Sequence, residues 1–355
     1  MDKGKVIIGM SGGVDSSVSA YLLKKAGYEV IGVTMETHDS ETIDDSNMSL
    51  AARDAKNVAN LLGISHYVVD FKKEFKEKVV DYFIGEYFDG KTPNPCVECN
   101  RYVKWCSIID RADQMNAEFI ATGHYAKVEK HPVTGRYTFK MSDAKAKDQT
   151  YVLYSLTQEQ LGRVLMPVGN YEKEEVRKIA EEIGLNVADK PDSMEICFIP
   201  DNDYTKYIME NSDKKPAEGN FVDMQGNVLG KHKGIIYYTI GQRKGLGITF
   251  GKPMFVCEIR ATANEVVLSD NSDLFKRVVY ANNVNFMAYE SIDGEFSGEA
   301  KIRYSHQKSG CVVRQISETE IECVFDEPQR AITPGQSIVI YEGDYVVCGG
   351  TIVFK

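Results

Sequence analysis

Short apolar segments alternate with longer segments of helical periodicity up to about residue 200 of the chain. Apolar runs at 6–10, 29–34, 66–70 and 119–122 predict strands. Between them the pattern predicts helices near 15–26, ended by Gly27, and near 49–62, ended by Gly63. This alternation predicts an α/β fold, a doubly wound parallel sheet with helices on both faces and the ligand at the carboxyl ends of the strands.

A different pattern begins near residue 201. One short helix is predicted over 203–209, and glycine-punctuated strands follow at 254–260, 265–269, 310–315, 320–325 and 337–341. We therefore expect three domains: an α/β domain over 1–202, a small mixed linker domain over 203–275 and a C-terminal antiparallel β-barrel over 276–355.

The turn between the first strand and the first helix carries the strongest chemical signal, in Met10-Ser-Gly-Gly-Val-Asp-Ser-Ser17. Gly12 and Gly13 have no Cβ, so the backbone can adopt positive φ and direct its N–H groups inward. The helix that follows adds its positive dipole end, and such a junction binds phosphate. Its serines supply hydroxyl donors, and Asp15 is expected to be a Mg²⁺ ligand or a carboxylate of a polar network.

This turn is neither of the two common nucleotide loops. It lacks the Gly-Lys-Ser/Thr ending of a Walker loop and the Gly-x-Gly-x-x-Gly spacing of a dinucleotide turn. The pattern Ser-Gly-Gly-Val-Asp-Ser-Ser instead resembles the pyrophosphate loop of enzymes that cleave ATP to AMP and pyrophosphate. An ordinary strand-to-helix turn is the alternative interpretation.

Cysteine placement is the second signal. Asn94 is expected to cap a helix with Pro95 at its first position, which puts Cys96 in the first turn and Cys99 on the same face. A helix N-terminus favours the thiolate, and basic residues follow at 101 and 104. We therefore expect a larger fraction of both cysteines to be in the reactive thiolate form. Two reduced thiols without special chemistry are the alternative.

The other cysteines carry weaker signals. Cys197 lies between Ile196 and Phe198, which on its own predicts a buried strand cysteine. Packing roles are expected for the remaining five, which are Cys106, Cys257, Cys311, Cys323 and Cys348. Eight cysteines in 355 residues are too few for a disulfide scaffold, and no apolar run is long enough to span a bilayer. We therefore expect a cytoplasmic protein without a membrane partner.

The charge balance restricts any nucleic-acid site to a local patch, because the formal net charge is −10. Residues 231–260 hold six Lys or Arg and one acid, and Tyr237 and Tyr238 offer stacking faces there. This window predicts an RNA-binding patch, with a solvated loop as the alternative.

Seven motifs in this order resemble the tRNA-specific 2-thiouridylase family. They are Gly9-Met-Ser-Gly-Gly-Val-Asp-Ser16, Thr92-Pro-Asn-Pro95 with Cys99-Asn100, Ala121-Thr-Gly-His-Tyr125, Lys147-Asp-Gln149, Ile196-Cys-Phe-Ile199, Thr239-Ile-Gly-Gln-Arg-Lys-Gly-Leu-Gly247 and Thr333-Pro-Gly-Gln-Ser337. The resemblance implies thiolation of the wobble uridine of tRNA with ATP and Mg²⁺. It also implies a protein partner, a cysteine desulfurase or sulfur relay, that delivers sulfur as a persulfide.

The resemblance also implies roles for single residues. The pyrophosphate would bind the loop formed by Gly9, Met10, Ser11, Gly12, Gly13, Val14, Asp15 and Ser16, and Met35 and Gly123 would line the adenine-nucleotide pocket. Cys197 matches the persulfide carrier, and Cys99 matches the partner thiol that attacks it and is left in a Cys99–Cys197 disulfide. Asn94, Pro95 and Cys96 would contact the target base. Contacts to tRNA are implied for Lys147, Asp148, Gln149, Arg303 and Tyr304, and the loop that holds Arg243 and Lys244 would follow the RNA backbone.

One position departs from the family pattern, because many members have an acidic residue where this chain has Cys96. Cys96, Cys99 and Cys197 could instead hold a 4Fe-4S cluster whose open iron binds sulfide. A zinc site is a third option and needs Cys106 or His124 as a fourth ligand. For His124, a nucleotide or base contact and a structural role are both open.

Two other functions compete with this interpretation. A pyrophosphate-loop amide ligase would adenylate a carboxylate or carbonyl for attack by ammonia, but it would not need Cys99 and Cys197. A non-enzymatic RNA- or metal-binding module would leave the phosphate loop unexplained.

Overall fold

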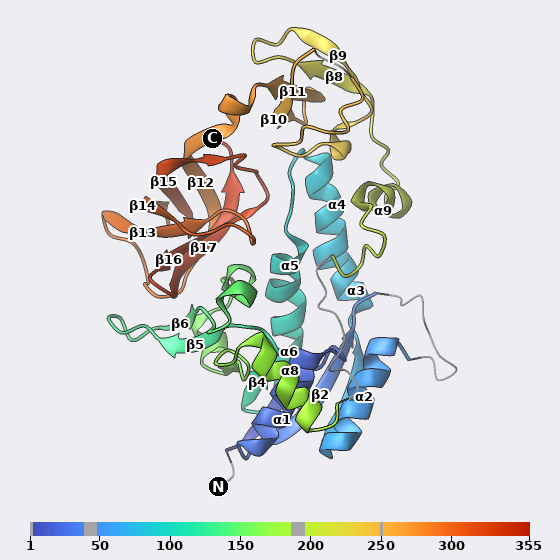
Figure 1. Cartoon of the computed structure of the whole chain (residues 1–355), viewed down its shortest axis with the longest axis vertical. Coiled ribbons are helices and arrows are strands. Elements are labelled where there is room, and N and C mark those ends of the chain that lie inside the picture. Colours follow the sequence, from blue (N-terminus) through green and yellow to red (C-terminus); the bar gives the residue numbers. More distant parts are fainter. Residues whose placement is uncertain (1–2, 39–47, 186–195, 249–250) are drawn as a thin grey trace.

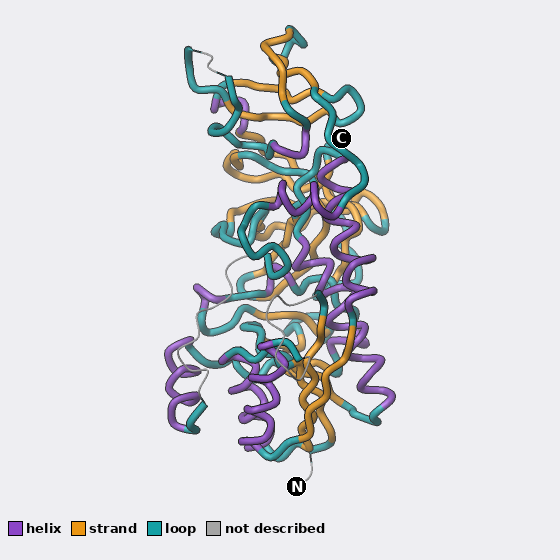
Figure 2. Tube along the Cα trace, turned by 90° about the vertical axis from the view of Figure 1, so that its right-hand side faces the viewer, coloured by secondary structure: helices purple, strands orange, loops and turns teal. Residues whose placement is uncertain are grey.

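The computed structural model describes residues 3–38, 48–185, 196–248 and 251–355. The chain forms an elongated molecule, with a parallel sheet at the N-terminal end, a small sheet at the far end and a barrel beside the helices that connect them (Figure 1). Turned by 90°, the same trace shows helices gathered around the first sheet and strands dominating the other end (Figure 2). In the described residues, every helix is too short or too polar to cross a membrane.

The first sheet confirms the predicted α/β fold. Its strands are β1 (Lys5–Gly9), β2 (Glu29–Glu36), β3 (Ser65–Asp70), β4 (Phe119–Ala121) and β7 (Val164–Leu165), in the order β3-β2-β1-β4-β7, and every pair is parallel.

Helices cover both faces of this sheet. Val6 and Ile8 of β1 pack in one cluster with α1 (Val14–Lys25), α2 (Leu50–Leu62) and α8 (Lys173–Glu182). Ile7 points the other way and packs with α6 (Trp105–Gln114). Gly63 ends α2 in the left-handed conformation at φ 59°, as its position predicts. The sheet is therefore doubly wound.

Two helical segments rise from the sheet toward the far end of the molecule (Figure 1). The first consists of α3 (Lys72–Phe75), the π-helical turn η1 (Lys76–Val80) and α4 (Asp81–Phe88). The second consists of α5 (Pro95–Glu98), the π-helical turn η2 (Cys99–Lys104) and α6. The loop between them binds the barrel, since Thr92 N–H donates to Pro334 C=O at 2.9 Å and Gln336 Nε2 donates to Thr92 C=O at 2.8 Å.

The small domain follows α9 (Tyr204–Asn211). Its sheet has the order β10-β11-β8-β9, from β8 (Gly219–Val222), β9 (Val228–His232), β10 (Phe255–Arg260) and β11 (Glu265–Ser269). The β8–β11 pair is parallel and the other two pairs are antiparallel, so the sheet is mixed in direction.

The C-terminal strands form the predicted antiparallel barrel. They are β12 (Phe275–Phe286), β13 (Glu295–Lys301), β14 (Ser309–Ser317), β15 (Glu320–Arg330), β16 (Ser337–Glu342) and β17 (Tyr345–Val353), and β12 pairs with β17 to close the ring. The buried Cys311, Cys323 and Cys348 lie in its core, as expected.

A hairpin from the N-terminal half extends the barrel sheet. Its strands are β5 (Lys127–Lys130) and β6 (Tyr137–Lys140), and Lys140 pairs with Tyr345 of β17. The buried His131 between them contacts Glu342, with 3.0 Å between Nε2 and Oε2. The sequence did not predict this hairpin, which ties the barrel to the parallel sheet.

The remaining elements are short. They are α7 (Gln158–Leu161) and the 3₁₀ turns Lys145–Lys147, Thr150–Val152, Ile235–Tyr237 and Asn271–Leu274.

Candidate active site

Three neighbouring strands end together below the phosphate loop. Gly9 pairs with Val33, and Ile8 with Ala121, so the residues that follow β1, β2 and β4 meet at one edge of the sheet. Ser11 and Gly123 lie there, and Met35 lies in the last residues of β2. The structure therefore brings the sequence-predicted loop and both lining residues to the carboxyl edge, where doubly wound sheets bind ligands.

Glycine is required at two positions of this edge. Gly12 has φ +70°, and a Cβ there would lie 2.5 Å from Ala51 C=O at the start of α2. A Cβ on Gly123 would lie 2.5 Å from Ser16 N. Larger residues would therefore displace the loop backbone whose N–H groups are expected to bind phosphate.

Hydroxyls fix the loop from inside. The buried Ser17 donates to Gly13 C=O at 2.7 Å, and the buried Ser16 donates to the same carbonyl at 3.2 Å. Ser16 Oγ also accepts from Ser11 N–H at 3.2 Å. Ser11 itself is exposed, so of the three serines only Ser11 presents its side chain to solvent.

Asp15 lies in the first turn of α1 and is already bound by two side chains. Lys173 Nζ is 2.7 Å and 2.9 Å from its two oxygens, and the Tyr125 hydroxyl donates to Oδ1 at 2.8 Å. Lys173 is buried and comes from the first turn of α8. This arrangement matches the network role of Asp15, because a Mg²⁺ ion would have to displace Lys173.

Sequence reasoning missed Lys173. It lies far along the chain from the loop and looks like one of many basic residues that begin a helix. Only the packing of α8 against α1 shows that its ammonium group points at Asp15. The local sequence gives no hint of this contact, because Lys173 stands between Glu172 and Glu174 at the start of a charged helix.

His124 follows β4 at the same edge. Its Nδ1 lies 2.6 Å from Thr122 Oγ1, and its ring lies 6.2 Å from that of Trp105. Burial lowers the His124 pKa well below its usual value, and the Lys104 charge lowers it further. His124 is therefore a neutral imidazole at pH 7.

The predicted cap of the cysteine helix is confirmed. Asn94 Oδ1 accepts from Cys96 N–H at 3.1 Å, and Pro95 begins α5. Cys96 is exposed, whereas Cys99 is 8% exposed and begins η2.

The expected thiolate enrichment is wrong for Cys99. Burial raises the Cys99 pKa to about 11, and the Lys104 charge lowers it only in part. The surrounding side chains also desolvate the Cys197 thiol and raise its pKa, although the residue as a whole is exposed. The prediction failed because desolvation of the thiolate raises the pKa more than the N-terminus of α5 lowers it. This helix has only four residues and continues directly into a π-helical turn.

The strand assignment for Cys197 is also wrong. Cys197 lies in a turn and is exposed, while its neighbours Phe198 and Ile199 are buried in the cluster that also holds Cys99. Negative charge on Cys197 or on Cys96 would each raise the Cys99 pKa, so the three thiols share one electrostatic neighbourhood.

The cysteines are free and do not form a metal centre as they stand. All eight are unpaired thiols. Across the described ranges, no three His, Cys, Asp or Glu side chains lie where they could hold one metal ion. Cys106, the suggested fourth zinc ligand, directs its Sγ to Arg101 C=O at 3.1 Å.

The residues suggested to contact tRNA have different environments. Tyr304 is 46% exposed, and its pKa is raised by burial and by charge on Asp148 and Cys96, which places it near Cys96. Lys147 is partly exposed. Arg303 Nη2 donates to Thr333 Oγ1 at 3.2 Å and also to Ala331 C=O.

The carboxylate of Asp148 accepts hydrogen bonds from the backbone of its own loop. Asp148 is buried and accepts from Ser142 N–H at 2.9 Å and from Thr150 N–H at 3.2 Å. Gln149 Oε1 accepts from Tyr125 N–H at 2.9 Å. Gln149 therefore links this loop to Tyr125, which binds Asp15, while Asp148 holds the loop itself.

Fewer cations of residues 231–260 are available for RNA than their number in the sequence indicates. Lys252 pairs with Asp270, and Arg260 pairs with Glu258 and Glu265. Tyr238 is buried against Phe221 and His232 and offers no stacking face. Four exposed cations have no ion pair within the part of the chain that is described: Lys231, Lys233, Arg243 and Lys244.

Comparisons with known proteins cover the whole chain. Residues 4–201 match the family model "tRNA methyl transferase HUP domain", residues 206–270 match "tRNA methyl transferase PRC-barrel domain" and residues 276–352 match "Aminomethyltransferase beta-barrel domain". A protein of Lachnoclostridium phytofermentans named tRNA-specific 2-thiouridylase MnmA is 56% identical, covering 98% of this chain and 99% of that protein. One of the same name from Clostridioides difficile is also 56% identical, covering 98% of each chain.

Among solved structures, the U34-tRNA thiolase NcsA from Methanococcus maripaludis with its [4Fe-4S] cluster is 20% identical. The alignment covers 55% of this chain and 61% of that one, at a TM-score of 0.34.

Proposed function

Because the chain belongs to the tRNA-specific 2-thiouridylase family, we propose that it uses ATP and a persulfide sulfur to convert the wobble uridine of tRNA to 2-thiouridine. One observation carries the proposal: a phosphate loop at a sheet edge and two thiols in one neighbourhood, Cys99 and Cys197, occur in the same chain. In this proposal residues 1–202 hold the catalytic machinery, and 203–275 and 276–355 bind tRNA.

The first step activates the base. The C2 carbonyl of uridine is a poor electrophile, and its oxygen cannot leave unaided. Transfer of AMP to this oxygen makes a good leaving group and releases pyrophosphate. The loop Gly9–Ser16 is proposed to bind the pyrophosphate portion of ATP, with Met35 and Gly123 beside the nucleotide.

Lys173 and Asp15 are proposed to act together at this step. The Lys173 ammonium group is the buried cation closest to the loop carboxylate, and it can move from Asp15 toward a phosphate oxygen. Mg²⁺ would accompany ATP and neutralise phosphate charge. Since both oxygens of Asp15 are occupied, no residue of the chain is assigned as its ligand.

The second step moves sulfur. A sulfur-donating protein places a sulfur atom on Cys197, which is exposed and accessible to a partner. The Cys99 thiolate attacks the Cys197 sulfur and expels the outer sulfur as hydrosulfide, leaving a Cys99–Cys197 disulfide. Hydrosulfide attacks C2 of the activated uridine, AMP leaves, and a thiol reductant of the cytoplasm reduces the disulfide to two thiols.

The target base is proposed to lie against Asn94, Pro95 and Cys96. Two observations support this position: Cys96 is exposed at the start of α5, and the exposed Tyr304 of the barrel lies near it. Lys147, Gln149 and Arg303 surround the same region in this proposal, while Asp148 contributes by holding its loop.

The 4Fe-4S cluster on Cys96, Cys99 and Cys197 is the second candidate for the sulfur step. The thiols as they stand do not form a metal-binding group within the described residues, and we therefore derive no step through a cluster. A persulfide relay needs only two of the three cysteines, which makes the two schemes separable.

The proposal is tested by reconstitution with unmodified tRNA, ATP, cysteine and a cysteine desulfurase. We expect one AMP and one pyrophosphate to be released for each 2-thiouridine formed. The 2-thiouridine is measured by mass spectrometry of digested tRNA. Pyrophosphate release that depends on ammonia and a carboxylate, with no tRNA requirement, would instead identify an amide ligase. Tight tRNA binding with no ATP cleavage would identify a binding module.

A further inference from the structure

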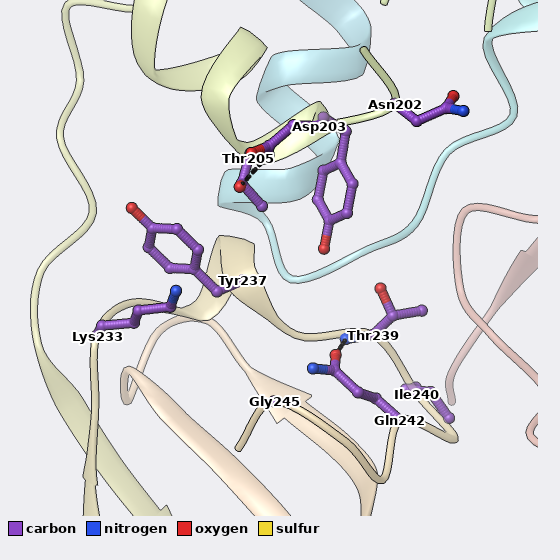
Figure 3. A pocket seen from close by; sticks show the side chains of 10 residues that line it. Asn202, Asp203, Thr205, Lys233, Tyr237, Thr239, Ile240, Gln242 and Gly245 are labelled. Atoms are coloured by element: carbon purple, nitrogen blue, oxygen red, sulfur yellow. Dashed lines mark hydrogen bonds between the residues drawn. The ribbon is translucent and has the colours of Figure 1, made fainter. Parts of the chain in front are cut away.

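A pocket of about 530 Å³ lies between the start of α9 and the loops of the small domain. Figure 3 shows Asn202, Asp203 and Thr205 on one side, facing Tyr237, Thr239 and Gln242 on the other. A second pocket of about 320 Å³ shares Asn202 and Tyr204 with the first, and Ile196 and Ile199 line it. Cys197 follows Ile196 directly in the sequence, so the second pocket adjoins the segment that carries this cysteine.

Tyrosine side chains line both pockets. The Tyr204 ring stacks on Tyr87 at 4.6 Å and 25°, and its hydroxyl is hydrogen-bonded to the Thr239 side chain. Tyr237 is partly buried against the clusters on both sides, and Lys233 Nζ lies 4.0 Å from its ring centroid. The first pocket therefore has an aromatic surface with a cation beside it.

The Gln242 side chain bridges the loop that lines one side of the pocket. Gln242 Oε1 accepts from Thr239 N–H at 2.9 Å, and its Nε2 donates to Lys244 C=O at 3.0 Å. This brace directs Thr239 to the pocket and leaves Arg243 and Lys244 exposed next to it. The Asp203 carboxylate caps α9 by accepting from Lys206 N–H at 2.9 Å and also binds Thr205.

We propose that this pocket binds one unpaired nucleotide of the tRNA, other than the target uridine, with its base against Tyr237 and its phosphate near Lys233. This inference rests on the proposed function. Aromatic rings stack with unpaired bases of any identity, and unpaired cations beside them bind the phosphates, which is the combination found here. The nucleotide would act as a second anchor while the target base reaches the cysteines.

An abasic scan of the anticodon arm tests the proposal with the full-length protein. Each unpaired nucleotide is replaced in turn by an abasic one, and the Kd of the tRNA is measured for wild type and for Tyr237→Ala. At one position besides the target we expect the abasic change to weaken wild-type binding about tenfold. The same change should have no further effect on Tyr237→Ala.

Two more variants complete the test. Tyr67→Ala removes a tyrosine that is 43% exposed on the edge strand β3, and its abasic profile should equal that of wild type. Since Tyr237 also contributes to packing, Lys233→Ala provides a second reading at an exposed residue. This variant should bind tRNA more weakly. The slope of log Kd against log salt should fall by about the amount expected for one phosphate contact.

Failure of this inference is distinguishable from failure of the proposed function. If wild type makes 2-thiouridine but no abasic penalty depends on Tyr237, the pocket does not bind a nucleotide. If Tyr237→Ala weakens binding of the sulfur-donating protein and leaves the abasic profile unchanged, the pocket binds that protein and the inference is wrong. Absence of 2-thiouridine with wild type would reject the proposed function itself.

Discussion

The phosphate loop and the cysteine site are built in opposite ways. At the loop, Gly12 and the neighbouring Gly123 leave no side-chain bulk, and the Asp15 carboxylate is bound by Lys173 and Tyr125. At the cysteine site, Cys96 and Cys197 are exposed thiols, and Cys99 is held in its protonated form by burial. The loop is thus arranged before substrate binds, whereas the thiols need a further event to become reactive.

This difference fits two different chemical demands. Stabilising phosphate charge needs fixed donors that do not reorganise during the reaction. A thiolate that is always charged beside an activated base would react early or become oxidised. In the proposed relay, the raised Cys99 pKa would keep that thiol protonated until tRNA, AMP or the persulfide changes its surroundings.

Replacing Asp15 should have the largest effect. In Asp15→Ala the Lys173 ammonium group loses its partner and the loop loses its network carboxylate. AMP and pyrophosphate formation should fall by at least about 100-fold, the usual scale for loss of a preorganised polar group. Asp15→Asn, which can keep the Tyr125 hydrogen bond, controls for folding. Pyrophosphate release at the wild-type rate would show that the loop is not the ATP site.

Removing the lysine partner should have a somewhat smaller effect. Lys173→Met keeps the length and burial of the side chain but removes its charge, and we expect adenylation to slow by about 10- to 100-fold. Lys173→Arg is the matched variant that keeps the charge. Rates of pyrophosphate release at saturating tRNA check this. If Met and Arg variants were equally impaired, Lys173 would serve packing and not phosphate binding.

Charge reversal in the small domain tests the RNA surface. Arg243 and Lys244 are exposed and unpaired within the described residues, so changing both to Glu should weaken tRNA binding. The slope of log Kd against log salt should become shallower, because fewer counterions are released. Lys252→Glu at a cation already paired with Asp270 is the control. An unchanged slope in the double variant would place the RNA contact elsewhere.

The raised Cys99 pKa predicts a gradual effect of pH. With a pKa of about 11, only about one Cys99 in ten thousand is a thiolate at pH 7. Alkylation of Cys99 should therefore accelerate about tenfold per pH unit from pH 7 to pH 10. The exposed Cys96 provides the comparison in the same digest, by mass spectrometry. A Cys99 rate that levels off below pH 8 would show that the helix end or Lys104 overcomes burial.

The sequence predicted what local rules decide. The turn from β1 into α1, the Asn94 cap and the glycine stop of α2 follow from neighbouring residues, and the structure confirms the geometry of all three. The role of Lys173 could not be predicted, because a contact between helices far apart in sequence brings it to Asp15. The β5–β6 hairpin could not be predicted, because its partner strand lies at the end of the chain. The Cys99 pKa was mispredicted because burial is a property of the whole fold.

The sulfur relay through Cys99 and Cys197 is the central claim, and tRNA thiolation by single cysteine variants tests it most directly. We predict that Cys99→Ser and Cys197→Ser make no 2-thiouridine, that Cys96→Ser keeps substantial activity without iron, and that all three still release pyrophosphate. Loss of activity in all three variants, together with loss of iron and visible absorption, would contradict the relay and support the cluster.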